Sequence, residues 1–129
     1  MAESLLIFNP KYKTQILRHR KRSGHLISKM RYVSSQLCAY LTDDLWLDLA
    51  KHANQQAQAF FEGCKDHVEF IHPVDANEVF CRLPVEKIAQ LKQQGFEFHV
   101  WPGSNDIIRL VFSHASSVSS VAQLIAAVK

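Results

Sequence analysis

The stretch EVFCRLPVEKIAQLKQQGFEFHVW, residues 78–101, changes its periodicity twice. Residues 78–84 are a mainly apolar run that ends at a proline, which is typical of a strand. Residues 85–94 place their apolar side chains on one helical face, and Gly95 is positioned to end that helix. Residues 96–101 then alternate apolar and polar side chains, as a half-buried strand does. The stretch therefore predicts a strand–helix–strand unit.

Two further strands and a helix flank this unit. An apolar run at 68–73 also ends at a proline, and a strand pattern at 107–112 follows the dense turn signal PGSND. After it, Ser116 or Ser117 is positioned to cap a last helix with apolar side chains at helical spacing. Because helices are followed by the order β-β-α-β-β-α, we expect an α+β domain with a small, mostly antiparallel sheet backed by helices.

The beginning of the chain is predicted to hold a strand and two helices. The apolar run Ser4–Phe8 indicates a short buried strand that ends at an Asn-Pro pair. Pro10 is well placed to open a helix over 11–22, which Gly24 would end. A second helix is expected to begin near His25, because apolar residues follow at spacings of three and four.

A third helix is predicted after Thr42. Thr42 is a typical N-cap residue, and Asp43 and Asp44 would lie in the first turn, where the helix dipole favours acidic side chains. Apolar residues over 46–61 recur on one helical face, and Gly63 is positioned to end the helix.

The charge of the chain is divided unevenly along its length. The formal net charge is +3, and eight of the fifteen Lys and Arg residues lie before residue 42. No acidic residue lies between Glu3 and Asp43, whereas the rest of the chain has seven basic and eleven acidic residues. The chain is therefore a basic segment followed by a mildly acidic body.

Several kinds of site are excluded by the residue pattern. Three cysteines without a CxxC spacing do not form a disulfide framework, which favours a reducing, cytoplasmic setting. No apolar run approaches the roughly 20 residues of a membrane span. The seven histidines include no H-x-x-x-H pair, and the chain has neither G-x-S-x-G nor a P-loop. We therefore expect no metal site and no membrane partner.

Arg109 is the charged residue of the predicted strand over 107–112. An unpaired buried guanidinium is very costly, so this side chain must reach solvent or be paired. Two interpretations remain open at this point. Arg109 is either an arginine on an exposed strand face or an anion clamp, since the guanidinium fork matches a carboxylate bidentately.

The basic stretch RHRKRSGHLISKMR, residues 18–31, has three interpretations. It is a solvated helix face, a nucleic-acid patch, or a specific phosphate contact made by one or two cations, particularly Arg31. No aromatic residues are interleaved with the cations, which argues against a nucleic-acid partner. With only four glycines, the chain has no glycine-rich phosphate cradle, and side chains would have to hold a phosphate.

The order of these motifs resembles the C-terminal part of threonine aldolases, which belong to the β-eliminating lyase group of pyridoxal-phosphate enzymes with the aminotransferase fold of type I. The resemblance covers almost the whole chain. The motifs that show it are, in order, MAESLLIFNP (1–10), RHRKRSGHLISKMR (18–31), LTDDLWLDLAKHANQQA (41–57), VDANEVFCRLP (74–84) and IIRLVFSHASS (107–117).

The resemblance implies roles for three residues. Arg109, in IIRLVFS, matches the family's arginine that binds the α-carboxylate of the amino-acid substrate. Arg31, in SKMR, matches the arginine that approaches the cofactor phosphate, in that family often across a dimer interface. Lys21, in the RK pair, matches a second phosphate contact. The segment between RK and MR is longer than the family's and has HLIS in place of a glycine-rich stretch, which leaves His25 without an assigned role.

The resemblance also implies that other parts of the active site lie outside this chain. In the family, the Schiff-base lysine precedes the segment that MAESLLIF resembles, on a large domain that also holds the aspartate and histidine against the cofactor ring. We therefore expect no catalytic residue here, pyridoxal phosphate only in the intact enzyme and none bound to this chain alone. The expected partners are the missing large catalytic domain and further copies of the chain in a homo-oligomer. The alternative is a non-catalytic binding or assembly module that uses residues 11–31 for an acidic or nucleic-acid partner.

The same resemblance divides the chain into two parts. Residues 1–24 are expected to be a strand and a basic helix from the edge of the large domain, and residues 25–129 the small C-terminal domain. The strand over 4–8 would have lost its neighbours, so we expect it to pair with another copy or to pack irregularly.

Overall fold

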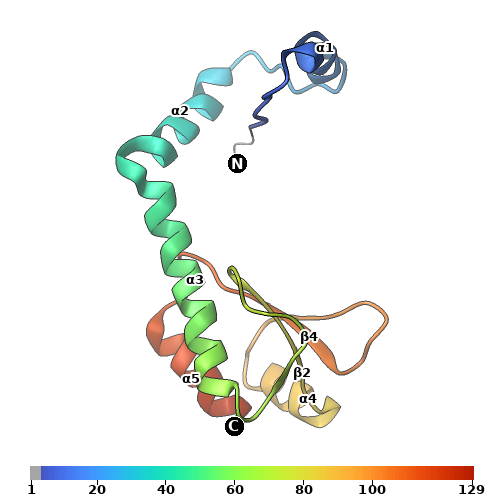
Figure 1. Ribbon diagram of the computed structural model, residues 1–129, viewed down its shortest axis with the longest axis vertical. Coiled ribbons are helices and arrows are strands. Elements are labelled where there is room, and N and C mark those ends of the chain that lie inside the picture. Colours follow the sequence, from blue (N-terminus) through green and yellow to red (C-terminus); the bar gives the residue numbers. More distant parts are fainter. Residues whose placement is uncertain (1–3) are drawn as a thin grey trace. The chain divides into compact units, whose positions relative to one another are not determined.

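The computed structural model describes residues 4–129, and the chain divides into two compact units, Met1–Trp46 and Leu47–Lys129 (Figure 1). This division differs from the predicted boundary after residue 24. That boundary concerns which part of an intact enzyme each segment comes from, and it stays a prediction. Among the described residues, no helix combines the length and apolar character that a membrane crossing requires.

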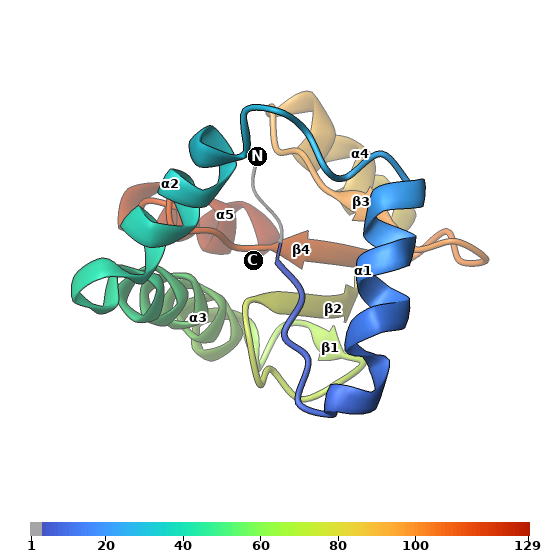
Figure 2. The same cartoon turned by 90° about the horizontal axis from the view of Figure 1, so that it is seen from above.

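The second unit is built around a four-stranded antiparallel sheet in the order β1-β2-β4-β3 (Figure 2). The sheet and its helices are α3 (Leu45–Cys64), β1 (Glu69–Phe70), β2 (Glu78–Arg82), α4 (Val85–Gln93), β3 (His99–Val100), β4 (Ile107–Val111) and α5 (Val118–Val128). The first two residues of α3, Leu45 and Trp46, belong to the first unit. The order β-β-α-β-β-α and the α+β class are confirmed. The outer strands β1 and β3 are shorter than the runs that predicted them.

Helices α3, α4 and α5 all contribute to one core on a single face of the sheet. Phe60 of α3 has no exposed surface, and its ring centroid lies 6.2 Å from that of Phe70 and 5.9 Å from that of Phe112. Full burial of a side chain of this size stabilises a fold by about 1.5–3 kcal/mol. The strands present to this core the side chains of Val79, Cys81, Ile108 and Leu110.

Local signals set several ends of these helices as predicted. The hydroxyl of Ser117 accepts a hydrogen bond from the backbone N–H of Ser120 at 3.1 Å, so Ser117 is the N-cap of α5. Gly95 follows α4 with a φ of 91°. Glycine adopts this conformation at little energetic cost because it has no Cβ.

The first unit holds a 3₁₀ turn (Pro10–Tyr12), α1 (Lys13–Arg22), α2 (Met30–Leu41) and a second 3₁₀ turn (Thr42–Asp44). Asn9 caps the first turn, because its side-chain oxygen accepts from the backbone N–H of Lys11 at 3.1 Å. None of the described residues of this unit is buried. The described helices of this unit therefore have no buried core to support them, and helices of this length are only marginally stable in water without one.

The predicted buried strand over Ser4–Phe8 is wrong for this chain. Residues 4–9 have no regular secondary structure, and the side chains of Leu5 and Phe8 are 69% and 92% exposed. A strand needs a partner strand for its backbone groups, and the four-stranded sheet uses no residue from this segment. Its predicted pairing with another copy stays a prediction.

The second helix begins at Met30 rather than near His25. The N–H of His25 bonds to the carbonyl of Arg20 at 3.1 Å, and the N–H of Gly24 bonds to that of Lys21 at 3.2 Å. With Gly24 at a φ of 76°, these bonds are a Schellman motif that ends α1. Because His25 completes that motif, the next helix starts after a turn.

The third helix also differs from the prediction at both ends. Asp43 and Asp44 have φ values of 52° and 56°, in the left-handed region, so α3 begins after them at Leu45. Gly63 lies inside α3 and does not end it. A Cβ added to Gly63 would lie 2.8 Å from Cδ1 of Ile125, so this glycine makes room for α5.

Candidate functional site

Arg109 lies in the middle of β4 on the sheet face that the three helices leave uncovered. Its neighbours along the strand, Ile108 and Leu110, are buried in the core, and side chains alternate between the two faces of a strand. The cross-strand partners of Arg109 are Phe80 on β2 and His99 on β3. We call this uncovered side the outer face. The structure thus places Arg109 in a row of three side chains across three strands.

The guanidinium of Arg109 has no close ionic or hydrogen-bond partner among the described side chains. Its Nη1 lies 4.0 Å from Oε1 of Glu78, which is too long for a hydrogen bond. Its Nε is buried and has no hydrogen-bond partner among residues 4–129. The side chain is 31% exposed, so its remaining donors can be reached by a ligand. This arrangement fits a bidentate anion such as a carboxylate.

Aromatic rings lie beside Arg109 on the outer face. The ring of Phe80 meets that of Trp101 edge-on, with centroids 5.1 Å apart, and that of His72 at 5.7 Å. Sequence reasoning did not single out these rings, nor Glu78. Phe80 could have been found from the alternation of side chains along β2, which places it on the same face as Arg109 once β2 is paired with β4.

A second arginine of the sheet has the opposite character. Nε of Arg82 lies 2.9 Å from Oε2 of Glu69, and its Nη1 also donates to Asp106. The hydroxyl of Ser104 donates to Asp106 at 2.6 Å. The Ser104 hydroxyl and the Arg82 guanidinium lower the pKa of Asp106, and its carboxylate in turn raises the pKa of Arg82. Arg82 is therefore already paired and ties the turn before β4 to the sheet.

The two predicted phosphate contacts lie in the first unit. Lys21 is in the last turn of α1, and Arg31 is in the first turn of α2, with its guanidinium carbon 5.3 Å from the ring centroid of Tyr32. Both side chains are exposed, and neither forms a salt bridge within the described residues. No acidic residue lies within residues 4–42, so neither cation has an acidic neighbour in the sequence of this segment.

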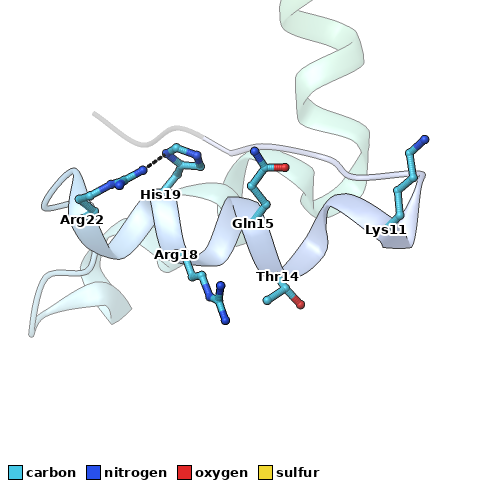
Figure 3. A pocket seen from close by; sticks show the side chains of 6 residues that line it. All are labelled: Lys11, Thr14, Gln15, Arg18, His19 and Arg22. Carbon is cyan, nitrogen blue, oxygen red and sulfur yellow. Dashed lines mark hydrogen bonds between the residues drawn. The ribbon is translucent and has the colours of Figure 1, made fainter.

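Helix α1 and the turn before it carry an exposed basic face. Lys11, Thr14, Gln15, Arg18, His19 and Arg22 line a surface depression along α1 (Figure 3). Nη2 of Arg22 lies 3.0 Å from Nδ1 of His19, and this is the hydrogen bond drawn between these side chains. These side chains are solvated, as the first interpretation of the stretch predicts. The side chain of His25, whose backbone N–H completes the end of α1, is exposed.

The described residues contain no group of three or more His, Cys, Asp or Glu side chains that could hold a metal ion. Their cysteines are free, with Cys38 exposed and Cys64 and Cys81 buried. Burial, and then the neighbouring Cys64, raise the pKa of Cys81 to about 12. Thiols of this kind are inert core residues rather than nucleophiles.

Two known proteins that are similar to this chain carry the same name. The chain is 35% identical over 106 residues to the low specificity L-threonine aldolase of a Pseudomonas species, which covers 81% of this chain and 31% of that protein. It is 32% identical over 126 residues to the protein of the same name from Pseudomonas aeruginosa, which covers 96% of this chain and 36% of that protein. No family model matches the chain.

The fold has a solved counterpart as well. The threonine aldolase of Leishmania major superposes with a TM-score of 0.78 at 25% identity, over 86% of this chain and 34% of that one. The chain therefore spans about a third of the length of the relatives it matches. The resemblance to the C-terminal part of threonine aldolases is confirmed, whereas the roles of Arg109, Arg31 and Lys21 stay predictions.

Proposed function

Because this chain is similar over nearly its whole length to about a third of a threonine aldolase, we propose that it is the small C-terminal domain of a lyase of that kind. The intact enzyme would cleave a β-hydroxy-α-amino acid, such as threonine, into glycine and an aldehyde. Pyridoxal phosphate, when bound in the intact enzyme, supplies the electron sink for breaking the carbon–carbon bond. The residues of this chain would bind the substrate and the cofactor phosphate and orient them.

The observation that supports this function best is the state of Arg109. A guanidinium on the outer face whose buried Nε has no partner among the described residues is costly to the fold unless a ligand completes it. The α-carboxylate of an amino acid has the geometry and charge to do so. In our proposal Arg109 holds that carboxylate and thereby fixes the substrate's orientation.

Arg31 and Lys21 are proposed as contacts to the cofactor phosphate. Both are exposed cations free of salt bridges within the described residues. Arg31 also lies in the first turn of a helix, where the backbone dipole favours an anion. Each residue would neutralise phosphate charge, and neither would take part in bond breaking.

We propose that the residues described here do not catalyse the reaction by themselves. A lysine that reacts with a carbonyl group must be desolvated. Lys87 is half-buried, but its Nζ donates to the carbonyl of Ala127 at 3.1 Å, and the other lysines are exposed. The partner that supplies the reactive lysine would be the catalytic domain that makes up the rest of the relatives' length. A homo-oligomer and a cytoplasmic location are proposed with it.

Two experiments test this function. The purified chain is titrated with pyridoxal phosphate, reduced with borohydride and examined by mass spectrometry. We expect no saturable absorbance change and no adduct on a single lysine, and such an adduct would contradict the proposal. In a chimera with the rest of the Pseudomonas aeruginosa enzyme, we expect R109K to raise KM for threonine by about tenfold or more, since Lys cannot replace a bidentate contact. An unchanged kcat/KM would remove the role of Arg109.

A second candidate function is a binding module that uses residues 11–31. The observation that favours it is the exposed cationic face of α1, which has no acidic residue within the described segment 4–42. A nucleic-acid partner would bind with an affinity that falls steeply as salt is raised. Fluorescence anisotropy with labelled duplex and single-stranded DNA tests this. Absent or salt-insensitive binding would remove the candidate.

A further inference from the structure

Glu78 places a negative charge beside Arg109 on the outer face. It is the first residue of β2, two positions before Phe80, so both side chains emerge on the same face of the sheet. Its Oε1 lies 4.0 Å from Nη1 of Arg109, and its side chain is 45% exposed. The guanidinium therefore has a carboxylate near it toward one end of β2, and Phe80 is the residue opposite Arg109 in the register of β2 and β4.

The separation shows that Glu78 does not occupy the guanidinium fork. In the same sheet, Arg82 shows what an occupied fork looks like, because its Nε donates to Glu69 at 2.9 Å and its Nη1 donates to Asp106. At Arg109 the nearest carboxylate oxygen stands about one ångström farther away, and Nε has no partner among the described residues. The donors of Arg109 thus remain available while a fixed negative charge stands next to them.

A ligand held by Arg109 would carry its other substituents toward these neighbours. The carboxylate of Glu78 lies on one side, the uncharged rings of Phe80 and Trp101 on another, and His99 on the β3 side. A ligand with one carboxylate and an uncharged side chain brings no second negative charge toward Glu78. A ligand with a second carboxylate brings it near Glu78.

We propose that Glu78 is a specificity-determining residue that makes Arg109 select amino acids with uncharged side chains and reject those with a second carboxylate. This inference rests on the proposed role of Arg109 as the carboxylate contact. Two unit charges about 6 Å apart in a water-like medium weaken binding by roughly threefold, and more where the dielectric constant is lower. Removal of the charge at Glu78 should therefore favour dicarboxylates by at least that factor.

NMR titration of the whole 129-residue chain with L-alanine and L-aspartate at one fixed pH tests this inference. The reporter is the Nε–H resonance of Arg109, which is suitable because this buried atom is shielded from solvent. The variants are E78Q, which removes the charge, E78D, which keeps it, and R109Q, which removes the proposed contact. E86Q is the matched control, since Glu86 lies in the first turn of α4, on the other side of the sheet.

We expect the wild-type chain to bind alanine more tightly than aspartate. E78Q should improve the affinity for aspartate, relative to alanine, by about threefold or more. E78D and E86Q should leave the ratio of the two affinities unchanged. R109Q, followed by the backbone resonances of β4, should bind neither amino acid.

Three outcomes would overturn the inference. An equal affinity ratio in E78Q and E86Q would show that Glu78 does not discriminate, while the role of Arg109 would stand. If neither amino acid shifts the Arg109 resonance in wild type or in E78Q, the selection by Glu78 is also overturned. The proposed function would stand in that case, because it is tested separately on the chimera. Unchanged binding by R109Q would overturn the role of Arg109 and the inference together.

Discussion

Phe80 and Arg109 are cross-strand partners on the outer face, so an aromatic and a cationic residue stand opposite each other on the sheet face that the three helices do not cover. Neither side chain contributes to the buried core. A purely structural sheet face of this kind would be expected to carry polar side chains that are paired or fully solvated. The unpartnered Nε of Arg109 is instead a cost to the fold.

That cost predicts that Arg109 can be replaced without loss of stability. In R109M the aliphatic part of the side chain is kept and the unpartnered donor is removed, so we expect the free energy of unfolding to rise by about 1 kcal/mol. Urea denaturation of the whole chain measures this. A fall of more than about 1 kcal/mol would show that the loose pair with Glu78 supports the fold.

R82M is the matched comparison on the neighbouring strand. Arg82 is hydrogen-bonded to Glu69 and Asp106, so its loss leaves two carboxylates without their partner. We expect the same denaturation experiment to show that R82M is less stable than wild type. If R82M and R109M change stability in the same direction, the assignment of one arginine to structure and the other to binding is wrong.

Asp106 is expected to contribute to the acid limb of the stability profile. Its pKa is lowered in the folded state by the Ser104 hydroxyl and by Arg82. A group with a lowered folded pKa stabilises the fold above its unfolded pKa and loses this contribution as pH falls through the folded pKa. D106N should therefore lose stability near neutral pH and show a flatter decline in acid. Parallel acid limbs for D106N and wild type would contradict this.

The sequence predicted those features of the fold that depend on near neighbours. The cap at Ser117, the stop at Gly95 and the strand at 107–112 need only the residues around them. The role of Gly63 depends on Ile125, which is distant in sequence and reaches it only when α5 packs on α3. A propensity pattern cannot distinguish a glycine that ends a helix from one that makes room for another.

The candidate site divides in the same way. Arg109 stood out because a charge in an apolar strand must find a partner or solvent. Glu78 and Phe80 were not identified, because their position beside Arg109 follows from the register of β2 against β4. Register is set by the burial of a whole face rather than by any local motif. The left-handed conformation of Asp43 and Asp44 was likewise not predicted, because Thr42 followed by two acidic residues is typical of a helix start.

The three cysteines should differ sharply in reactivity. Cys38 is exposed, whereas Cys64 and Cys81 are buried, and burial raises the pKa of both buried thiols. Because the thiolate is the reactive form, we expect Ellman's reagent to modify only Cys38 in the native chain and all three thiols in denaturant. The variant C38S should then show no rapid reaction, and rapid modification of C38S would place a second thiol at the surface.

Loss of the α5 cap should cost stability without changing the fold. The Ser117 hydroxyl accepts from the N–H of Ser120, and α5 supplies Val121, Leu124 and Val128 to the core. We expect S117A to lower the free energy of unfolding by about 1 kcal/mol, a typical value for a lost N-cap. S119A, which changes a serine two residues further along in the first turn of α5, should have little effect in the same denaturation experiment. Equal losses in both variants would argue against a specific cap.

The first unit should be the first part of the chain that trypsin cuts. Its described residues include none that are buried, and the basic stretch over 18–31 offers many cleavage sites, whereas Arg109 lies within the sheet. Cleavage requires local opening, which is easier in helices without a core. We expect mass spectrometry to find an early resistant fragment that contains residues 47–129. If cleavage within 18–31 slows as the chain concentration rises, another copy covers the first unit, as the predicted homo-oligomer requires. First cuts within β4 would instead contradict the division of stability between the two units.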